Sequence, residues 1–157
     1  MDTVTTSSAA KMKNSVKTLK QNGTILLVED DQDDIFIFKR ALVAANVLNP
    51  VVVLNNGQAA VDYLSHQGEY SSPEKNPLPF VIFLDLKLPY LDGFEVLTWI
   101  RQQPQLRSVI VVVLSSSDES RDHKRAYELG ARSYLVKPSG AQEIRQFMDS
   151  MASYWGE

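Results

Sequence analysis

The sequence predicts an α/β fold in which a doubly wound, parallel sheet of five strands carries five helices on its two faces. Three observations predict it. Five short apolar runs recur along the chain, each is followed by a segment with apolar residues at helical spacing, and Gly, Pro, Asn and Asp separate the two kinds of segment. Strands that alternate with helices in this way lie parallel and are joined by right-handed crossovers.

The composition indicates one ordinary globular domain. A chain of 157 residues is long enough to bury a sizeable core. It contains no cysteine, which excludes disulfides and thiolate metal sites and is consistent with the cytoplasmic location that we expect. The longest apolar run, Val109–Leu114, is too short to cross a bilayer, and the N-terminus shows no apolar signal segment. We therefore expect no membrane partner.

The charges are divided unevenly along the chain. Residues 1–20 carry four lysines and one acid, whereas the remainder carries 12 basic and 18 acidic residues, a balance of −6. An acidic folded part argues against general nucleic-acid binding. The first segment is rich in Ser and Thr and has few large apolar residues. We therefore expect residues 1–22 to form a basic, disordered tail and residues 23–157 to form the folded domain.

The first half of the chain predicts two strands and two helices. Acids follow the first strand and precede the first helix, where they favour the positive end of the helix dipole. We expect Asp33 or Asp34 to cap this helix, and Asp31 to be solvated or to cap it. The predicted elements are a strand over Thr24–Val28, a helix over Ile35–Val47, a strand over Pro50–Leu54 and a helix that ends near His66.

The second half predicts three strands and three helices after an irregular segment. Residues 68–79 contain three prolines, and we interpret them as a loop. The next strand, Phe80–Leu84, runs into Asp85, which is either a cap for the following turn or a reactive group at the sheet edge. The other elements are a helix capped by Asp92, a strand over Val109–Leu114, a helix that ends at Leu129, a strand over Ser133–Val136 and a helix from about Gly140 to Tyr154.

Polar residues follow four of the predicted strands. Glu29 and Asp30 follow the first strand, Asp85 the third, Ser115 the fourth and Lys137 the fifth. Because the carboxyl ends of parallel strands lie along one edge of a sheet, we expect these side chains to converge. Crowded carboxylates repel one another unless a cation compensates them, and oxygen ligands of this kind suit Mg²⁺. The chemistry that uses such a set is phosphoryl transfer to a carboxylate.

Four motifs at these strand ends resemble those of response regulator receiver domains. They are ILLVEDD at residues 25–31, LDLKLP at 84–89 with Asp92-Gly93, VLSS at 113–116, and Lys137-Pro138. Each motif is weak alone, but the four occur in the right order, and the resemblance extends from about Thr24 to Tyr154. It implies a flavodoxin-like sheet with the strand order 2-1-3-4-5. It also implies a signalling protein that phosphorylates and dephosphorylates itself, and not an enzyme.

The resemblance implies a role for each residue at the edge. Asp85 would be the phosphoacceptor, and Lys137 would pair with the phosphoryl group. Ser115 and Tyr134 would be the switch hydroxyl and the switch aromatic. The expected cofactor is Mg²⁺, which would be bound by Glu29, Asp30, Asp85 and the backbone carbonyl of Lys87. Asp30 would be a direct ligand, and Glu29 would bind mostly through water.

Three further residues near the motifs carry separate expectations. The side chain of Lys87 is next to the reaction centre, and we expect it to influence how long the phosphoryl group survives. The alternative is that Lys87 is an ordinary surface lysine with no effect on the phosphoryl group. We expect His66 and His123 to be ordinary surface histidines, because no paired spacing supports a transition-metal site.

The partners follow from the resemblance as well. The phosphodonor would be a histidine kinase, and the chain looks like the single-domain receivers that partner bacterial phytochrome-type kinases. Its output surface would be the fourth helix, fifth strand and fifth helix, through which we expect a homodimer. Candidate residues on this surface are Arg125, Tyr127, Glu128, Tyr134 and Tyr154.

Two other functions compete with this one. Hydrolases that form an aspartyl-phosphate intermediate usually carry a second acid two residues after the nucleophile, and this position is Lys87 here. The absent acid argues against an efficient enzyme. The other possibility is a pseudo-receiver, a scaffold that is not phosphorylated. A pseudo-receiver is expected to lack one of the metal-binding acids, the phosphoacceptor aspartate or the phosphate-pairing lysine. This sequence contains all of these residues.

Overall fold

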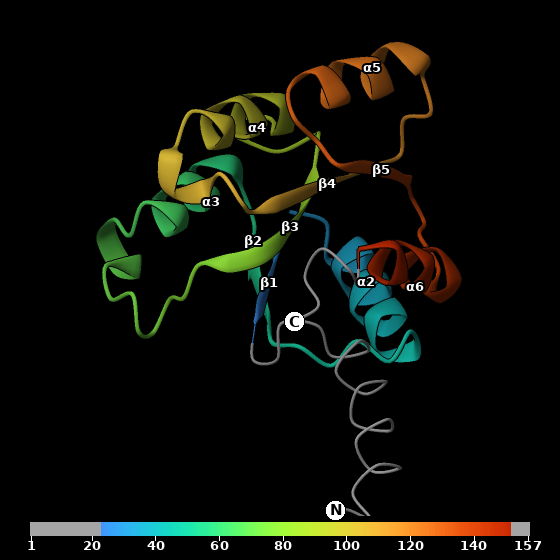
Figure 1. Ribbon diagram of the computed structural model, residues 1–157, viewed down its shortest axis with the longest axis horizontal. Coiled ribbons are helices and arrows are strands. Elements are labelled where there is room, and N and C mark those ends of the chain that lie inside the picture. Colours follow the sequence, from blue (N-terminus) through green and yellow to red (C-terminus); the bar gives the residue numbers. More distant parts are fainter. Residues whose placement is uncertain (1–22, 152–157) are drawn as a thin grey trace, which may run out of the picture.

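Figure 1 shows the computed structural model of the protein, in which residues 23–151 are described. The predicted tail, residues 1–22, and the end of the last predicted helix with Tyr154 lie outside the described residues. The division into a tail and a folded domain therefore stays a prediction. Within residues 23–151, no helix combines the length and the apolar character that a membrane span requires.

The centre of the fold is a five-stranded parallel sheet in the order β2-β1-β3-β4-β5, which confirms the predicted topology. Adjacent residues of each buried strand point to opposite faces, so each strand contributes to two cores. The strands are β1 (Thr24–Val28), β2 (Val51–Leu54), β3 (Pro79–Asp85), β4 (Ile110–Ser115) and β5 (Ser133–Val136).

Within the described residues, five helices cover the two faces of the sheet, as predicted (Figure 1). They are α2 (Gln32–Ala44), α3 (Gly57–Leu64), α4 (Gly93–Arg101), α5 (Ser120–Glu128) and α6 (Ala141–Ser150). The apolar residues of α2 and α6 pack on one face, around the ring of Phe83 from β3. That ring lies 4.8 Å from Phe38 of α2 and 6.2 Å from Phe147 of α6, measured between centroids. Residues of α3, α4 and α5 pack on the other face.

The start of α2 differs from the prediction. The helix begins at Gln32, and Asp31 is its cap, because its side chain accepts a hydrogen bond from the backbone N–H of Asp34 at 2.9 Å. Neither Asp33 nor Asp34 caps the helix. The apolar periodicity indicated a start at Ile35 because the first turn of the helix is polar and carries no apolar signal.

Two other helix starts follow local sequence signals. Asp92 caps α4 as predicted and forms a capping box with Glu95. Asn56 caps α3, which begins at Gly57, because its side chain accepts a hydrogen bond from the backbone N–H of Ala59. The loop at residues 68–79 contains a short 3₁₀ helix, Gly68–Tyr70.

Gly93 allows α4 to approach the end of β3. Its N–H donates to the carbonyl of Leu86 at 2.9 Å, and a Cβ at this position would collide with the backbone carbonyl of Asp85 and the Cα of Leu86. We expect Gly93→Ala to lower the free energy of unfolding by roughly 1 to 3 kcal/mol, because the backbone must move to relieve the overlap. Urea unfolding measures this change.

The matched control for this prediction is Gly140→Ala. A Cβ at Gly140, the residue before α6, meets no atom within 4 Å. We expect a smaller loss, confined to the poorer capping by alanine. Equal losses in the two variants would contradict the close approach as the reason for Gly93.

Candidate functional site

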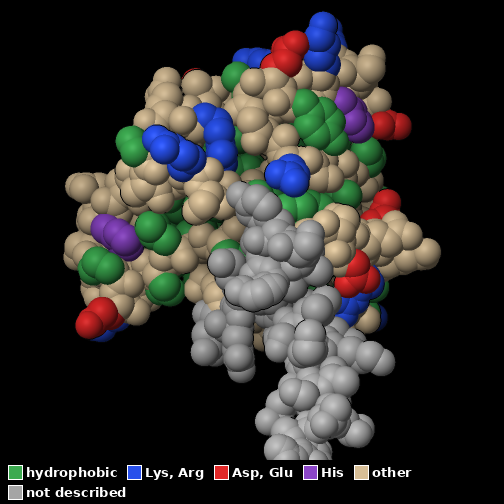
Figure 2. Space-filling model, in the orientation of Figure 1, with side chains coloured by type: hydrophobic (Ala, Val, Ile, Leu, Met, Phe, Trp, Pro, Cys, Tyr) green, Lys and Arg blue, Asp and Glu red, His purple; other side chains and the backbone are tan. Residues whose placement is uncertain are grey.

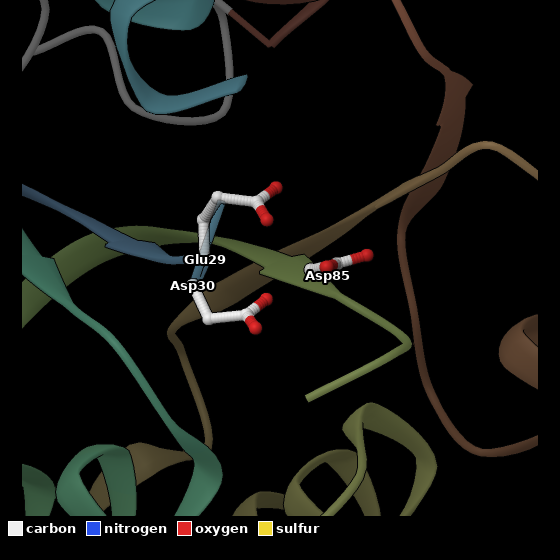
Figure 3. Close-up of side chains that lie close together, drawn as sticks. All are labelled: Glu29, Asp30 and Asp85. Atoms are coloured by element: carbon white, nitrogen blue, oxygen red, sulfur yellow. The ribbon is translucent and has the colours of Figure 1, made fainter. Parts of the chain in front are cut away.

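The carboxyl edge of the sheet brings three carboxylates together. Asp85 is the last residue of β3, and Glu29 and Asp30 follow β1 directly. Their side chains point into the same space (Figure 3), and one carboxylate oxygen from each lies within 4.8 Å of the others. Glu29 and Asp85 are buried, whereas Asp30 is exposed. The predicted convergence of these acids is therefore confirmed in the geometry.

Lys137 reaches the same site from the end of β5. Its Nζ lies 2.7 Å from Glu29 Oε1 and 3.4 Å from Asp85 Oδ1. A third acid, Asp34, was not predicted to take part, yet its Oδ2 lies 2.9 Å from the same Nζ. Asp34 is on the first turn of α2, and the packing of this helix against the sheet brings its side chain to Lys137. No spacing in the sequence indicated this contact.

The pKa values of Glu29, Asp85 and Lys137 are all raised, the acids chiefly by burial and the lysine by its acidic neighbours. Burial, together with the nearby Asp85 carboxylate, raises the pKa of Glu29 to about 7, despite its hydrogen bond with Lys137. Burial also raises the pKa of Asp85. For Lys137, burial alone would lower the pKa, but hydrogen bonds to Glu29 and Asp34 and the charge of Asp85 raise it overall. One ammonium therefore only partly compensates the negative charge at this edge.

The acids fit a divalent cation. Three carboxylate oxygens from two neighbouring strand ends are hard ligands, and the exposed Asp30 leaves one side open for water molecules, which Mg²⁺ retains when bound. The backbone of Lys87 lies next to the same site, because its N–H is 3.4 Å from Asp85 Oδ1. The metal-binding role of its carbonyl stays a prediction. The Lys87 side chain is exposed.

Ser115 ends β4 beside the acids. Asp85 pairs with Leu114 across the two strands, so Ser115 is one residue further along the same edge. Its side chain is buried, and its Oγ accepts a hydrogen bond from the N–H of Ser117 at 3.0 Å. Its carbonyl accepts the N–H of Lys137 at 2.8 Å. The backbones of Ser115 and Lys137 are therefore held together, while the Ser115 hydroxyl bonds the loop that follows β4.

Tyr134, the predicted switch aromatic, is buried in β5 and is linked to this hydroxyl. The Tyr134 hydroxyl donates to the carbonyl of Ser117 at 3.0 Å, and the N–H of Ser117 bonds Ser115. Ser117 therefore connects the two predicted switch residues, a role that sequence reasoning missed. It could not be read from the sequence because the loop conformation, and not its composition, aims these groups.

The two histidines are partly exposed, and each has a defined contact. The ring of His123 stacks on Tyr134 at 3.8 Å between centroids, and its Nε2 lies 3.2 Å from Asp118. Figure 2 shows histidine side chains on the surface of one face of the molecule, next to hydrophobic side chains. The Nε2 of His66 lies 2.8 Å from the carbonyl of Asn76, across the loop before β3. Among residues 23–151, the metal-ligand group that the geometry identifies contains no histidine.

Comparison with known proteins identifies relatives over most of the chain. Residues 25–149 match the model of the response regulator receiver domain family. The chain is 38% identical over 133 residues to response regulator Rcp1 of Synechocystis sp., covering 85% of this chain and 88% of that protein. The Mn²⁺-bound form of Rcp1 superposes with a TM-score of 0.69 at 37% identity and covers 86% of this chain and 95% of that one.

Two further solved structures are similar. The bacteriophytochrome response regulator RtBRR has a TM-score of 0.77 at 40% identity, with coverage of 86% of this chain and 81% of that one. The phosphorylated cyanobacterial phytochrome response regulator RcpA has a TM-score of 0.70 at 35% identity, with coverage of 85% and 93%. The similarity extends over nearly all of the described residues.

Proposed function

The chain belongs to the response regulator receiver domain family of two-component signalling, and we propose that it accepts a phosphoryl group on Asp85 from a histidine kinase. The observation that carries the proposal is the placement of Asp85 at the end of β3, within 3.4 Å of Lys137 Nζ and beside two more acids. Capping the following turn does not explain this arrangement, because the turn contributes one long contact, 3.4 Å from the N–H of Lys87, whereas Lys137 and two more acids also surround the Asp85 carboxylate.

Each residue has a task in the proposed reaction. An oxygen of Asp85 attacks the phosphorus in line with the leaving group, and the ammonium of Lys137 neutralises charge on the phosphoryl oxygens. Glu29, Asp30, Asp85 and the carbonyl of Lys87 would hold Mg²⁺, which supplies further positive charge there. The Mn²⁺-bound form of Rcp1 supports a divalent ion at this kind of site. The position two residues after Asp85 is an exposed lysine, which disfavours rapid hydrolysis and hence an enzyme.

The proposed switch follows from the link through Ser117. If Ser115 turns toward the phosphoryl oxygens, its contact with the Ser117 N–H is lost, and the anchor of the Tyr134 hydroxyl changes with it. The added phosphoryl group carries a charge of about −1.5 to −2 and three acceptor oxygens, enough to favour a second arrangement of this loop. The surface that responds is formed by α5, β5 and α6.

A direct experiment tests the phosphoacceptor function. The protein is incubated with acetyl phosphate and Mg²⁺, and its intact mass is measured. We expect a gain of one phosphoryl group that is absent when EDTA replaces Mg²⁺. No gain in either sample, under conditions that label another receiver domain, would favour the scaffold that is not phosphorylated. Release of phosphate from small phosphoesters with rapid turnover would instead favour a hydrolase.

The proposed kinase must bind where it can place its phosphohistidine against Asp85. The helix α2 begins beside the site, and its Phe36 and Ile37 side chains are 60% and 44% exposed. Ile37 also lines a small hollow that reaches Glu29 and Lys137. We propose that the kinase covers this part of α2. The similar phytochrome response regulators favour a phytochrome-type kinase as the partner.

One substitution can distinguish an effect on kinase binding from an effect on the phosphoryl-transfer reaction. We expect Phe36→Asp to slow phosphotransfer from a phytochrome-type histidine kinase at least about tenfold. The substitution places a charge where the proposed complex would bury the apolar ring of Phe36. Phosphorylation by acetyl phosphate should stay within about twofold. Val43→Asp, further along α2 and 65% exposed, is the control. Equal slowing with both donors would contradict the docking role.

The proposed homodimer uses the α5–β5–α6 face. Tyr127 is 49% exposed on α5, and Arg125 and Glu128 lie on the same helix. Light scattering of the protein, with and without a phosphoryl mimic and Mg²⁺, tests this proposal. We expect a dimer in at least one of the two states. A monomer in both states at all accessible concentrations would count against it.

Lys87 is expected to lengthen the life of the phosphoryl group. Its long, exposed side chain begins two residues from Asp85 and can cover the group against attacking water. We expect Lys87→Asn to shorten the half-life of the phosphorylated protein by about two- to tenfold, whereas Lys87→Met, which keeps the length, should change it less. The exposed loop residue Lys75 provides the control Lys75→Asn. An unchanged half-life in Lys87→Asn would refute the idea.

A further inference from the structure

The ammonium of Lys137 is surrounded by carboxylates. A lysine ammonium has three N–H donors. Here three carboxylate oxygens lie near it, from Glu29 at 2.7 Å, Asp34 at 2.9 Å and Asp85 at 3.4 Å. The Lys137 side chain is only 15% exposed, which leaves little room for water or for another acceptor. A phosphoryl oxygen that pairs with this lysine must therefore displace one of the three.

Asp34 is the carboxylate that can leave most easily. The side chain of Glu29 is 2% exposed and that of Asp85 is 7% exposed, so neither can exchange the lysine for bulk water. The side chain of Asp34 is 37% exposed, and it can turn to solvent and be hydrated. Asp34 is also outside the group of three acids that fits a metal, so no cation would hold it in place.

We propose that Asp34 is a positioning residue. In the unphosphorylated protein it holds the ammonium of Lys137 by an ion pair, and it competes with the phosphoryl group for that ammonium. This inference rests on the proposed function of Asp85. Asp34 acts through the lysine, and its effect is to lower the affinity of the site for a phosphoryl group. The contact links α2, at the kinase-facing side of the site, to the end of β5, 103 residues later in the chain. It is broken when the phosphorylated state forms.

Removal of the competing carboxylate should therefore tighten the binding of a phosphoryl mimic. Beryllofluoride, which binds an aspartate in the manner of a phosphoryl group, is titrated at saturating Mg²⁺ into the parent, Asp34→Asn and Asp34→Ala proteins. Because a partly exposed ion pair contributes up to about 1 kcal/mol, we expect both variants to bind roughly three- to sixfold more tightly. Asp34→Glu, which keeps a carboxylate within reach of the lysine, should return the affinity toward that of the parent.

The control is Asp33→Asn, which removes the same charge from an exposed position on the same turn of α2. We expect its affinity to stay within about twofold of the parent. An unchanged or weaker affinity in Asp34→Ala overturns the proposal, since Asp34 would then orient the lysine or merely stabilise the fold. Equal tightening in Asp33→Asn also overturns it, because the effect would be one of general charge. If neither the parent nor Asp33→Asn binds beryllofluoride, the proposed function fails as well.

Discussion

Replacing Asp85 by Asn is expected to abolish phosphorylation by acetyl phosphate and to stabilise the unphosphorylated protein. The amide is not a nucleophile, so no phosphoryl group can be accepted at this position. The amide is also neutral. Because burial raises the pKa of Asp85, the ionised carboxylate is disfavoured in the folded state, and the neutral side chain removes this penalty. We expect a higher free energy of unfolding than that of the parent at neutral pH without Mg²⁺.

Two measurements check this prediction independently. Intact mass spectrometry after treatment with acetyl phosphate and Mg²⁺ reports phosphorylation, and urea unfolding in EDTA reports stability. Asp33→Asn is the control for both, since it makes the same chemical change at an exposed residue of α2. A variant that still gains one phosphoryl group would assign the acceptor elsewhere. A loss of stability in Asp85→Asn would mean that its pairing with Lys137 outweighs the cost of burial.

The stability of the metal-free protein should fall as the pH rises through the range from about 4.5 to 7. The pKa of Glu29 rises from 4.5 to about 7 on folding, chiefly through burial. In this range the folded state binds more protons than the unfolded state, so the contribution of Glu29 to stability is fully present below pH 4.5 and is lost as the pH rises through 7. Each unit of pKa corresponds to about 1.4 kcal/mol, so the loss amounts to a few kcal/mol.

Urea unfolding of the parent and of Glu29→Gln, in EDTA at several pH values, isolates this contribution. The difference in free energy between the two proteins should be constant at low pH and shift against the parent between pH 4.5 and 7. Mg²⁺ should stabilise the parent more at pH 8 than at pH 5, because the cation binds the ionised acids. A difference that does not vary with pH would contradict the raised pKa of Glu29.

The contact between Asp34 and Lys137 is of a kind that the apolar periodicity of the sequence cannot predict. Local patterns placed each strand and helix within a few residues, and the order of the strand ends brought Glu29, Asp85 and Lys137 to one edge. Asp34 looked like any acid at a helix start, where its charge favours the dipole. Its partner is 103 residues away, and only the packing of α2 against the sheet brings the two groups within 2.9 Å.

His123 and Ser117 show the same limit at the switch. Neither residue type nor spacing distinguishes His123 from an ordinary surface histidine, yet in the fold it stacks on Tyr134. Ser117 is one of three consecutive serines, and its backbone connects Ser115 to Tyr134 only because the loop turns there. Contacts of this kind depend on the distance between elements, which a one-dimensional pattern does not contain.

The sequence by itself determined the five-stranded parallel sheet, the family and the set of acids at one edge, because strand and helix periods are local and parallel strands share an edge. Only the tertiary structure decided how deeply Glu29 is buried, and hence its raised pKa, and which three carboxylates surround Lys137. Burial and charge pairing depend on atoms brought together from distant parts of the chain. They therefore follow from packing and not from the order of residues.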